Sequence, residues 1–227
     1  YKRQVFNMPD MVKLVVDTLA RDIEDIDKVL AVKDRVREEA IQLSRTIIRA
    51  SAEVTRMLHL GRYSDAYNKL VEAQKGSQKL LNLLNNHPDL LYSGLVNNCI
   101  SEYVEASIVY NLIVEKKILS YKELSVPIVP YLQGLGDIVG ELRRHIIDLL
   151  RIEEYEEAEV YLDIMETIYQ ELRRLNYPDA LVPGLRHKVD VARRLIEDTK
   201  ILYLNTINAS KLMSRLDKVS EFFTKDS

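Results

Sequence analysis

The chain has 227 residues, of which 47% are hydrophobic and 30% are charged, and its formal net charge is −3. This near-neutral balance excludes a protein that binds nucleic acid through overall positive charge, so any such surface must be local. The single cysteine excludes an internal disulfide framework. There is no apolar run of about 18 residues that could span a membrane, and YKRQVFNMPDMVK at the start lacks the apolar core of a signal peptide. We therefore expect a soluble, cytoplasmic protein with no membrane partner.

Glycines and prolines are few, and apolar residues recur at helical spacing almost throughout. This pattern predicts an all-α fold of about seven long helices in a single domain over residues 1–227. In chain order, the expected helices cover residues 9–30, 33–60, 64 to the 83–88 segment, 88–118, 130–151, 154–175, and from 178 or 183 to beyond 203. A short tail helix is expected after the last of these. Ser120 and Glu123 have the spacing of a capping box for a short helical turn.

The segment ISEYVEASIVYNLI, residues 100–113, is apolar nearly all the way round when drawn as a helix. A helix of this kind is expected to be buried on most sides. Glu102 and Glu105 nevertheless lie about 60° apart on it. Two neighbouring carboxylates on a buried helix require either a polar environment or a bound cation.

A second acidic pair follows in the segment PYLQGLGDIVGELRRH. Asp137 and Glu141 are four residues apart and share a helix face. Three of the chain's seven glycines fall in the same segment, which suggests close packing against another backbone or a ligand. If the two acidic faces meet, four carboxylates converge. They would then suit Mg²⁺ or Mn²⁺, which can activate water and stabilise charge on a phosphoryl group.

Ordinary solvent-facing pairs remain an alternative, because acidic pairs at helical spacing are common among 35 acidic residues. A helical di-iron protein is a further possibility, but its Glu-x-x-His pairs are not found here. The four histidines form no metal-spaced pair, and Cys99 is expected in the core. No phosphate-binding loop or dinucleotide fingerprint is present.

A basic stripe is expected on the helix over residues 33–60. Arg45, Arg49, Arg56 and His59 fall within about 80° of arc, opposite an apolar face. Arg144 adds a positive charge beside the second acidic pair. These arginines suit phosphate binding, although surface arginines are also normal on solvated helices.

Four segments together resemble the translin family, and in particular its branch of translin-associated factor X. They are IQLSRTIIRASAEVTRMLH, EYVEA, GLGDIVGELRR and KVDVARRLIEDTKILYLN, which occur in the family's order over roughly residues 35–204. The resemblance implies a seven-helix subunit that assembles into a hollow octamer and binds single-stranded or duplex nucleic acid. It also implies that Glu102, Glu105, Asp137 and Glu141 hold Mg²⁺ for endoribonuclease activity. Pro130 departs from the family pattern, and the short connection after residue 118 is typical of a compact prokaryotic, archaeal-type homologue.

We therefore expect an Mg²⁺-dependent endoribonuclease that acts inside a homo-oligomeric shell. The resemblance implies that this shell is an octamer. Its catalytic and metal-binding residues would be Glu102, Glu105, Asp137 and Glu141. Its nucleic-acid-binding residues would be Arg45, Arg49, Arg56 and Arg144. Two alternatives remain open: a translin-like protein that binds single-stranded RNA or DNA without catalysis, and a helical scaffold whose carboxylates are merely solvated.

Overall fold

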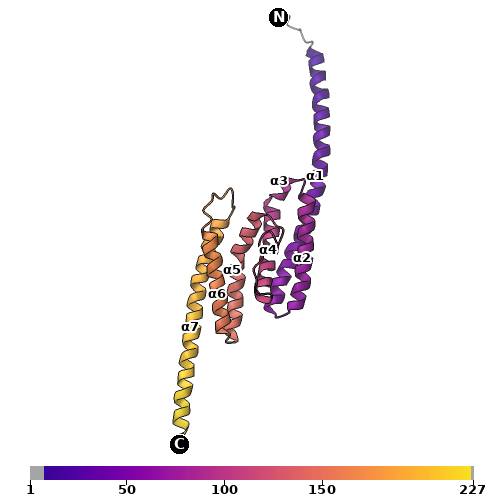
Figure 1. Ribbon diagram of the computed structural model, residues 1–227. Helices are drawn as coiled ribbons and strands as arrows, with labels where there is room; N and C mark the ends of the chain where they lie inside the picture. The colour runs from indigo at the N-terminus through magenta and orange to yellow at the C-terminus, as the bar shows by residue number, and fades with distance from the viewer. Residues whose placement is uncertain (1–7, 226–227) are drawn as a thin grey trace.

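The computed structural model describes residues 8–225, and that part of the chain contains helices and no strands, which confirms the all-α prediction (Figure 1). The helices are α1 (Met8–His59), α2 (Tyr63–Leu84), α3 (Pro88–Leu91), α4 (Gly94–Val114), α5 (Ile128–Arg151), α6 (Tyr155–Arg173) and α7 (Leu185–Lys225). Between residues 8 and 225, no helix is long and apolar enough to cross a lipid bilayer.

The helices pack as neighbours in a layered bundle. One side consists of α1 and α2, the middle of α4 and α5, and the other side of α6 and α7 (Figure 1). The first half of α1 and the last part of α7 extend beyond this body at opposite ends. The body therefore presents α4 and α5 to each other at its centre.

Several predicted boundaries are wrong. The first two predicted helices form one continuous helix, α1, of 52 residues, because the AVKD segment at their junction holds no proline or glycine to interrupt it. The predicted tail helix is the continuation of α7. The predicted helix over residues 88–118 is instead divided into α3 and α4, because Ser93 is extended with φ −70° and ψ 154° and Gly94 begins the new helix.

The connection before α5 contains the predicted capping box, but as a turn rather than a helix. The backbone N–H of Ser120 donates to Oε2 of Glu123 at 2.8 Å, and the backbone N–H of Glu123 donates to Oγ of Ser120 at 3.3 Å. This reciprocal pair satisfies two backbone donors in a segment that has no helix to satisfy them.

Helix α4 is the most thoroughly buried helix of the body, as its all-round apolar pattern predicts. Its buried residues include Tyr103, Val104 and Ile108, and it contacts α1, α2 and α5. Its buried polar side chains bond to the helix's own backbone: Ser107 Oγ donates to the carbonyl of Tyr103 at 2.6 Å. Internal satisfaction of this kind removes the cost of burying a hydroxyl among apolar neighbours.

Two of the three glycines in α5 permit close packing, as expected. A Cβ added at Gly134 would lie 2.7 Å from Cγ1 of Val104 and 2.9 Å from the carbonyl oxygen of Ser101, both on α4. A Cβ at Gly136 would lie 2.8 Å from Cβ of Lys188 on α7. The expectation is wrong for Gly140, where an added Cβ would meet no atom within 4 Å. The absence of side chains at the first two positions brings α4, α5 and the start of α7 together.

Candidate metal centre and nucleic-acid interface

The two predicted acidic pairs lie on the neighbouring helices α4 and α5, and all four side chains are partly buried. Burial first, and then the charges of Asp137, Glu102 and Glu141 in that order of size, together raise the pKa of Glu105 to about 8. The four carboxylates are therefore close enough to act on one another. At neutral pH, Glu105 keeps its proton unless a cation stabilises the charged form.

Glu102 experiences the same surroundings to a smaller degree. Burial and then the charge of Asp137 raise its pKa, while the charge of Lys188 lowers it. The charge of Lys188 lowers the pKa of Glu105 as well, but no hydrogen bond contributes to the pKa of either glutamate. These two carboxylates of α4 are the acidic groups in the cluster that most need a counter-charge.

Lys188, in the first turn of α7, supplies one cation to this cluster. Its Nζ contacts both carboxylate oxygens of Asp137, and the two side chains are 26% and 33% exposed. Because Lys188 lies 51 residues beyond Asp137 in the chain, sequence reasoning did not find this pair. The glycine at position 136 marked a close approach at this point but did not identify its partner.

His59 occupies the other side of the cluster. Its Nε2 lies 2.7 Å from Oε2 of Glu141, and its Nδ1 lies 3.0 Å from Oδ2 of Asp148, also on α5. The His59 side chain is only 5% exposed. The prediction that it belongs to an outward-facing stripe is therefore wrong, because pairing with two carboxylates draws the ring into the junction of α1 and α5. Asp148 was not predicted as a member of the site.

The chemistry of the donors fits a hard divalent cation, because four carboxylates on neighbouring helices influence one another's charge and two of them have raised pKa values. The arrangement is not preassembled: in the described part of the chain, no three His, Cys, Asp or Glu side chains are placed to hold one ion. Lys188 pairs with Asp137, and His59 pairs with Glu141. A metal at this position would have to draw the carboxylates together and compete with the Lys188 ammonium.

The arginines of the predicted basic stripe lie on the exposed surface of α1. Arg56 pairs with Glu53 at 2.7 Å, whereas residues 8–217 offer no ion pair to Arg45 or Arg49. One turn beyond Arg56, α1 ends at the buried His59, whose ring contacts Glu141. The basic surface of α1 therefore leads directly to the acidic cluster on α5.

The two arginines of α5 have different environments. Arg144 is exposed, as a phosphate-binding residue requires. Arg143 is partly buried, and its guanidinium donates to Oγ1 of Thr199 at 3.1 Å and to the carbonyl of Leu195 at 3.4 Å. Arg143 therefore joins α5 to α7, and Arg144 alone of this pair is available to a ligand.

Cys99 lies in the core, as predicted. It is fully buried, its Sγ donates to the carbonyl of Ser44 at 3.6 Å, and burial raises its pKa to about 11. The thiol stays protonated at neutral pH and is not a nucleophile.

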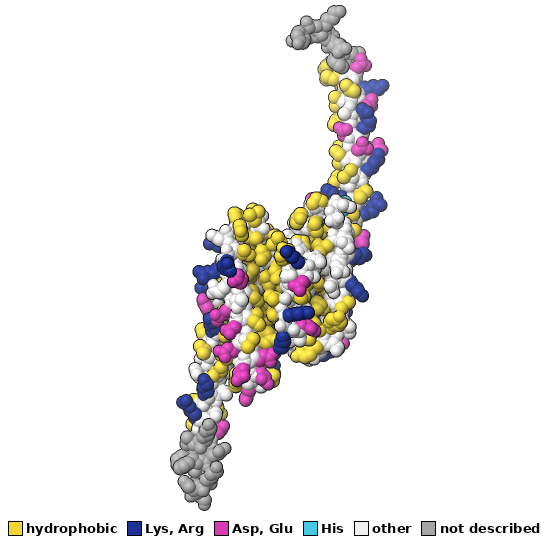
Figure 2. Space-filling model, viewed as in Figure 1, with side chains coloured by type: hydrophobic (Ala, Val, Ile, Leu, Met, Phe, Trp, Pro, Cys, Tyr) yellow, Lys and Arg dark blue, Asp and Glu magenta, His cyan; other side chains and the backbone are white. Residues whose placement is uncertain are grey.

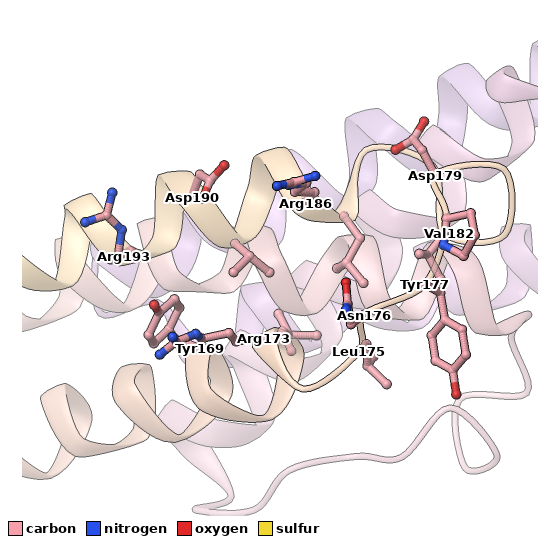
Figure 3. A pocket seen from close by; sticks show the side chains of 14 residues that line it. Tyr169, Arg173, Leu175, Asn176, Tyr177, Asp179, Val182, Arg186, Asp190 and Arg193 are labelled. Carbon is pink, nitrogen blue, oxygen red and sulfur yellow. The ribbon is translucent and has the colours of Figure 1, made fainter.

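A cleft of about 800 Å³ lies between the end of α6 and the start of α7 (Figure 3). Arg186 and Arg193 of α7 and Arg173 of α6 line it. By the helical step, Lys188 faces roughly the opposite side of α7 from this cleft. The cleft contains none of the predicted site residues and is separate from the acidic cluster.

These features define an all-helical protein with a partly buried acidic cluster at the end of a basic helix surface. The translin family model matches residues 35–200, and the chain belongs to the translin family. It is 34% identical over 191 residues to the uncharacterised protein MJ0175 of Methanocaldococcus jannaschii, a match that covers 84% of this chain and 85% of the relative.

The solved structures that resemble the fold include the complex of AfC3PO with duplex RNA. That chain is 32% identical, with a TM-score of 0.77 and coverage of 83% of this chain and 97% of the other. The crystal structure of AfC3PO gives a TM-score of 0.76 at 32% identity, covering 83% and 98% of the two chains. Apo-NeC3PO, at 22% identity, has a TM-score of 0.71 over 84% and 96% of the chains and supports the fold.

Proposed function

We propose that this chain is an Mg²⁺-dependent endoribonuclease that binds RNA within a homo-oligomer. The expected homo-oligomer is an octamer. The observation that carries this proposal is the partly buried group of four carboxylates on α4 and α5, in which burial and the neighbouring acids raise the pKa of Glu105 to about 8. The similarity to AfC3PO, whose structure in complex with duplex RNA has been solved, supports RNA as the ligand.

Glu102, Glu105, Asp137 and Glu141 would hold Mg²⁺ or Mn²⁺ through their oxygen atoms. When bound, the ion supplies stabilisation of charge on the phosphate and a more acidic water. The protein holds the carboxylates on α4 and α5, whose spacing depends on the close approach at Gly134. Glu105 binds a proton when no cation is present and releases it when a cation is bound.

Arg45, Arg49 and Arg56 would bind the RNA backbone along α1, and Arg144 would bind it on α5 beside the acids. Their guanidinium groups pair with phosphate oxygens. Contacts of this kind fix the position of RNA without reading its sequence. Recognition is therefore expected to be weakly sequence-specific and salt-sensitive, and single-stranded DNA would compete for the same surface.

Cleavage of a labelled single-stranded RNA and a labelled duplex tests the proposal, with Mg²⁺, with Mn²⁺ and with EDTA. Glu105→Gln and Asp137→Asn are expected to lower the rate by at least about 100-fold while RNA binding persists. Glu115→Gln, which changes an exposed carboxylate at the end of the same α4, is the matched control and should cleave normally. Unchanged cleavage by both site variants would exclude these acids from the reaction.

A second candidate function is RNA binding without catalysis. The contacts of Asp137 with Lys188 and of Glu141 with His59 favour it, because they give two of the four acids a protein partner without a metal. This candidate predicts a salt-dependent RNA complex and no cleavage in the presence of Mg²⁺ or Mn²⁺. A helical scaffold would show neither activity.

A further inference from the structure

The first part of α1 is a projecting arm, residues 8–32, which we call the α1 arm. It extends away from the body (Figure 1), and every side chain in it is exposed. The translin family model matches the chain from residue 35. The arm is therefore an addition to the part of the subunit that matches the family.

Apolar residues follow a heptad repeat along the arm. Val12, Val16, Leu19, Ile23, Ile26 and Leu30 are separated alternately by four and three residues, and each is 52–61% exposed. If Val16 and Ile23 are given position a, then Val12, Leu19 and Ile26 take position d. Three consecutive heptads of this pattern are typical of a coiled coil.

The repeat forms a continuous apolar stripe on one side of the arm, with charged side chains on the other (Figure 2). Val15 and Val29, at position g, widen the stripe. An isolated helix does not keep so long an apolar face in water without a partner. In residues 8–32 the chain provides no second helix to cover it.

We infer that the α1 arm pairs with the α1 arm of a second copy of this chain in an antiparallel coiled coil. In this orientation Val12 lies opposite the partner's Leu30, and Leu19 lies opposite the partner's Ile23, so all six heptad positions meet apolar residues. Positions e of the two helices adjoin each other, which places Lys13 beside the partner's Asp27 at both ends. These two ion pairs favour this register.

The charges disfavour a parallel pair. Parallel arms place Asp22 at g beside the partner's Asp27 at e, twice, with no compensating ion pair. The antiparallel pair brings only the two Asp22 side chains near each other. The exposed end of α7 is a poorer partner, because Asn205 and Asn208 interrupt its apolar positions after Leu204.

Site-specific crosslinking of the full chain tests this pairing. In Val12→Cys/Leu30→Cys, a short bis-maleimide should link two chains. In the proposed register, position 12 of each chain lies opposite position 30 of its partner. Within one arm the two positions are about 27 Å apart, so a link inside one chain cannot form. Cys99 is fully buried and does not interfere.

Addition of Leu19→Asp and Ile23→Asp should abolish the crosslink by charging the stripe. Addition of Arg21→Asp, which introduces the same charge on the outer face, should leave it intact. Val12→Cys alone should give no linked dimer. Crosslinking of Val12→Cys alone to the same extent as the double variant would indicate parallel arms and would overturn the inference. A double variant that gives no linked dimer would also overturn it.

Discussion

The ammonium of Lys188 lies against both carboxylate oxygens of Asp137, so the first turn of α7 provides a positive charge to an acidic cluster built on α4 and α5. The pair is only partly exposed. The Lys188 ammonium therefore supplies positive charge that a divalent cation would otherwise provide. Removal of this ammonium should reveal how strongly the cluster needs a cation.

Lys188→Met keeps most of the side-chain stem but removes the ammonium. Without divalent ions, we expect the free energy of unfolding to fall by about 1–2 kcal/mol, because a partly buried carboxylate loses its charged partner. Mg²⁺ should restore more stability to this variant than to the unchanged chain. Thermal unfolding with and without Mg²⁺ measures both effects. Lys200→Met, which removes an exposed partner of Glu166, serves as the control and should respond to Mg²⁺ as the unchanged chain does.

The protonation of Glu105 should make stability depend on pH. Burial and three neighbouring acids raise its pKa from 4.5 to about 8. The folded protein thus holds this proton more tightly than the unfolded chain, so the stabilising contribution is complete below pH 4.5 and is lost as pH rises towards 8. In EDTA, Glu105→Gln should lose less stability than the unchanged chain between pH 5 and about 9. Parallel pH profiles for the two proteins would contradict this assignment.

His59 should be essential to the junction between α1 and α5. His59→Ala removes a partner that Glu141 and Asp148 share, from a site where the ring is 5% exposed. We expect a loss of about 2–3 kcal/mol in the free energy of unfolding, since two partly buried carboxylates lose a hydrogen bond. Urea denaturation measures this loss. His187→Ala, at an exposed position in the first turn of α7, should be close to neutral.

The basic surface of α1 should determine the salt dependence of RNA binding. If Arg45 and Arg49 each neutralise one phosphate, the double change to alanine should weaken binding for all sequences alike. The slope of log K against log salt should fall by about 1.4 for a single strand. Fluorescence anisotropy over a salt series measures this change. Arg174→Ala, which alters an exposed arginine paired with Glu171 on α6, should leave the slope unchanged.

The glycines of α5 allow a matched comparison of packing. Gly134→Ala introduces a Cβ against Val104 and the backbone of Ser101, and should destabilise the fold by about 1–3 kcal/mol. Gly140→Ala meets open space, and should stabilise α5 by about 0.5–1 kcal/mol through its higher helix propensity. Equal effects at the two positions would show that the approach of α4 and α5 does not depend on Gly134.

Local pattern was sufficient to predict the helical fold, the burial of α4 and the place of each acidic pair on one face of its own helix, but not that the two helices would be neighbours. The partners of the acids could not be predicted in the same way. His59 and Glu141 are 82 residues apart in the chain, and Lys188 and Asp137 are 51 apart. Such pairs depend on how helices pack, and periodicity within one helix carries no information about them. The predicted break between residues 30 and 33 is wrong, because no proline or glycine interrupts the helix there.

The burial of α4 has a consequence for the order in which parts of the molecule open. Backbone amides around Glu102 and Glu105 lie within the most enclosed helix and should exchange with solvent deuterium among the slowest, near the rate set by global unfolding. Lys188 lies just beyond the loop that ends at Gly184, and its turn should exchange through smaller, more frequent openings. Glu102 and Glu105 on one side and Lys188 on the other are thus expected to belong to regions of different local stability. The Lys188 ammonium can then move away while the two glutamates stay in place.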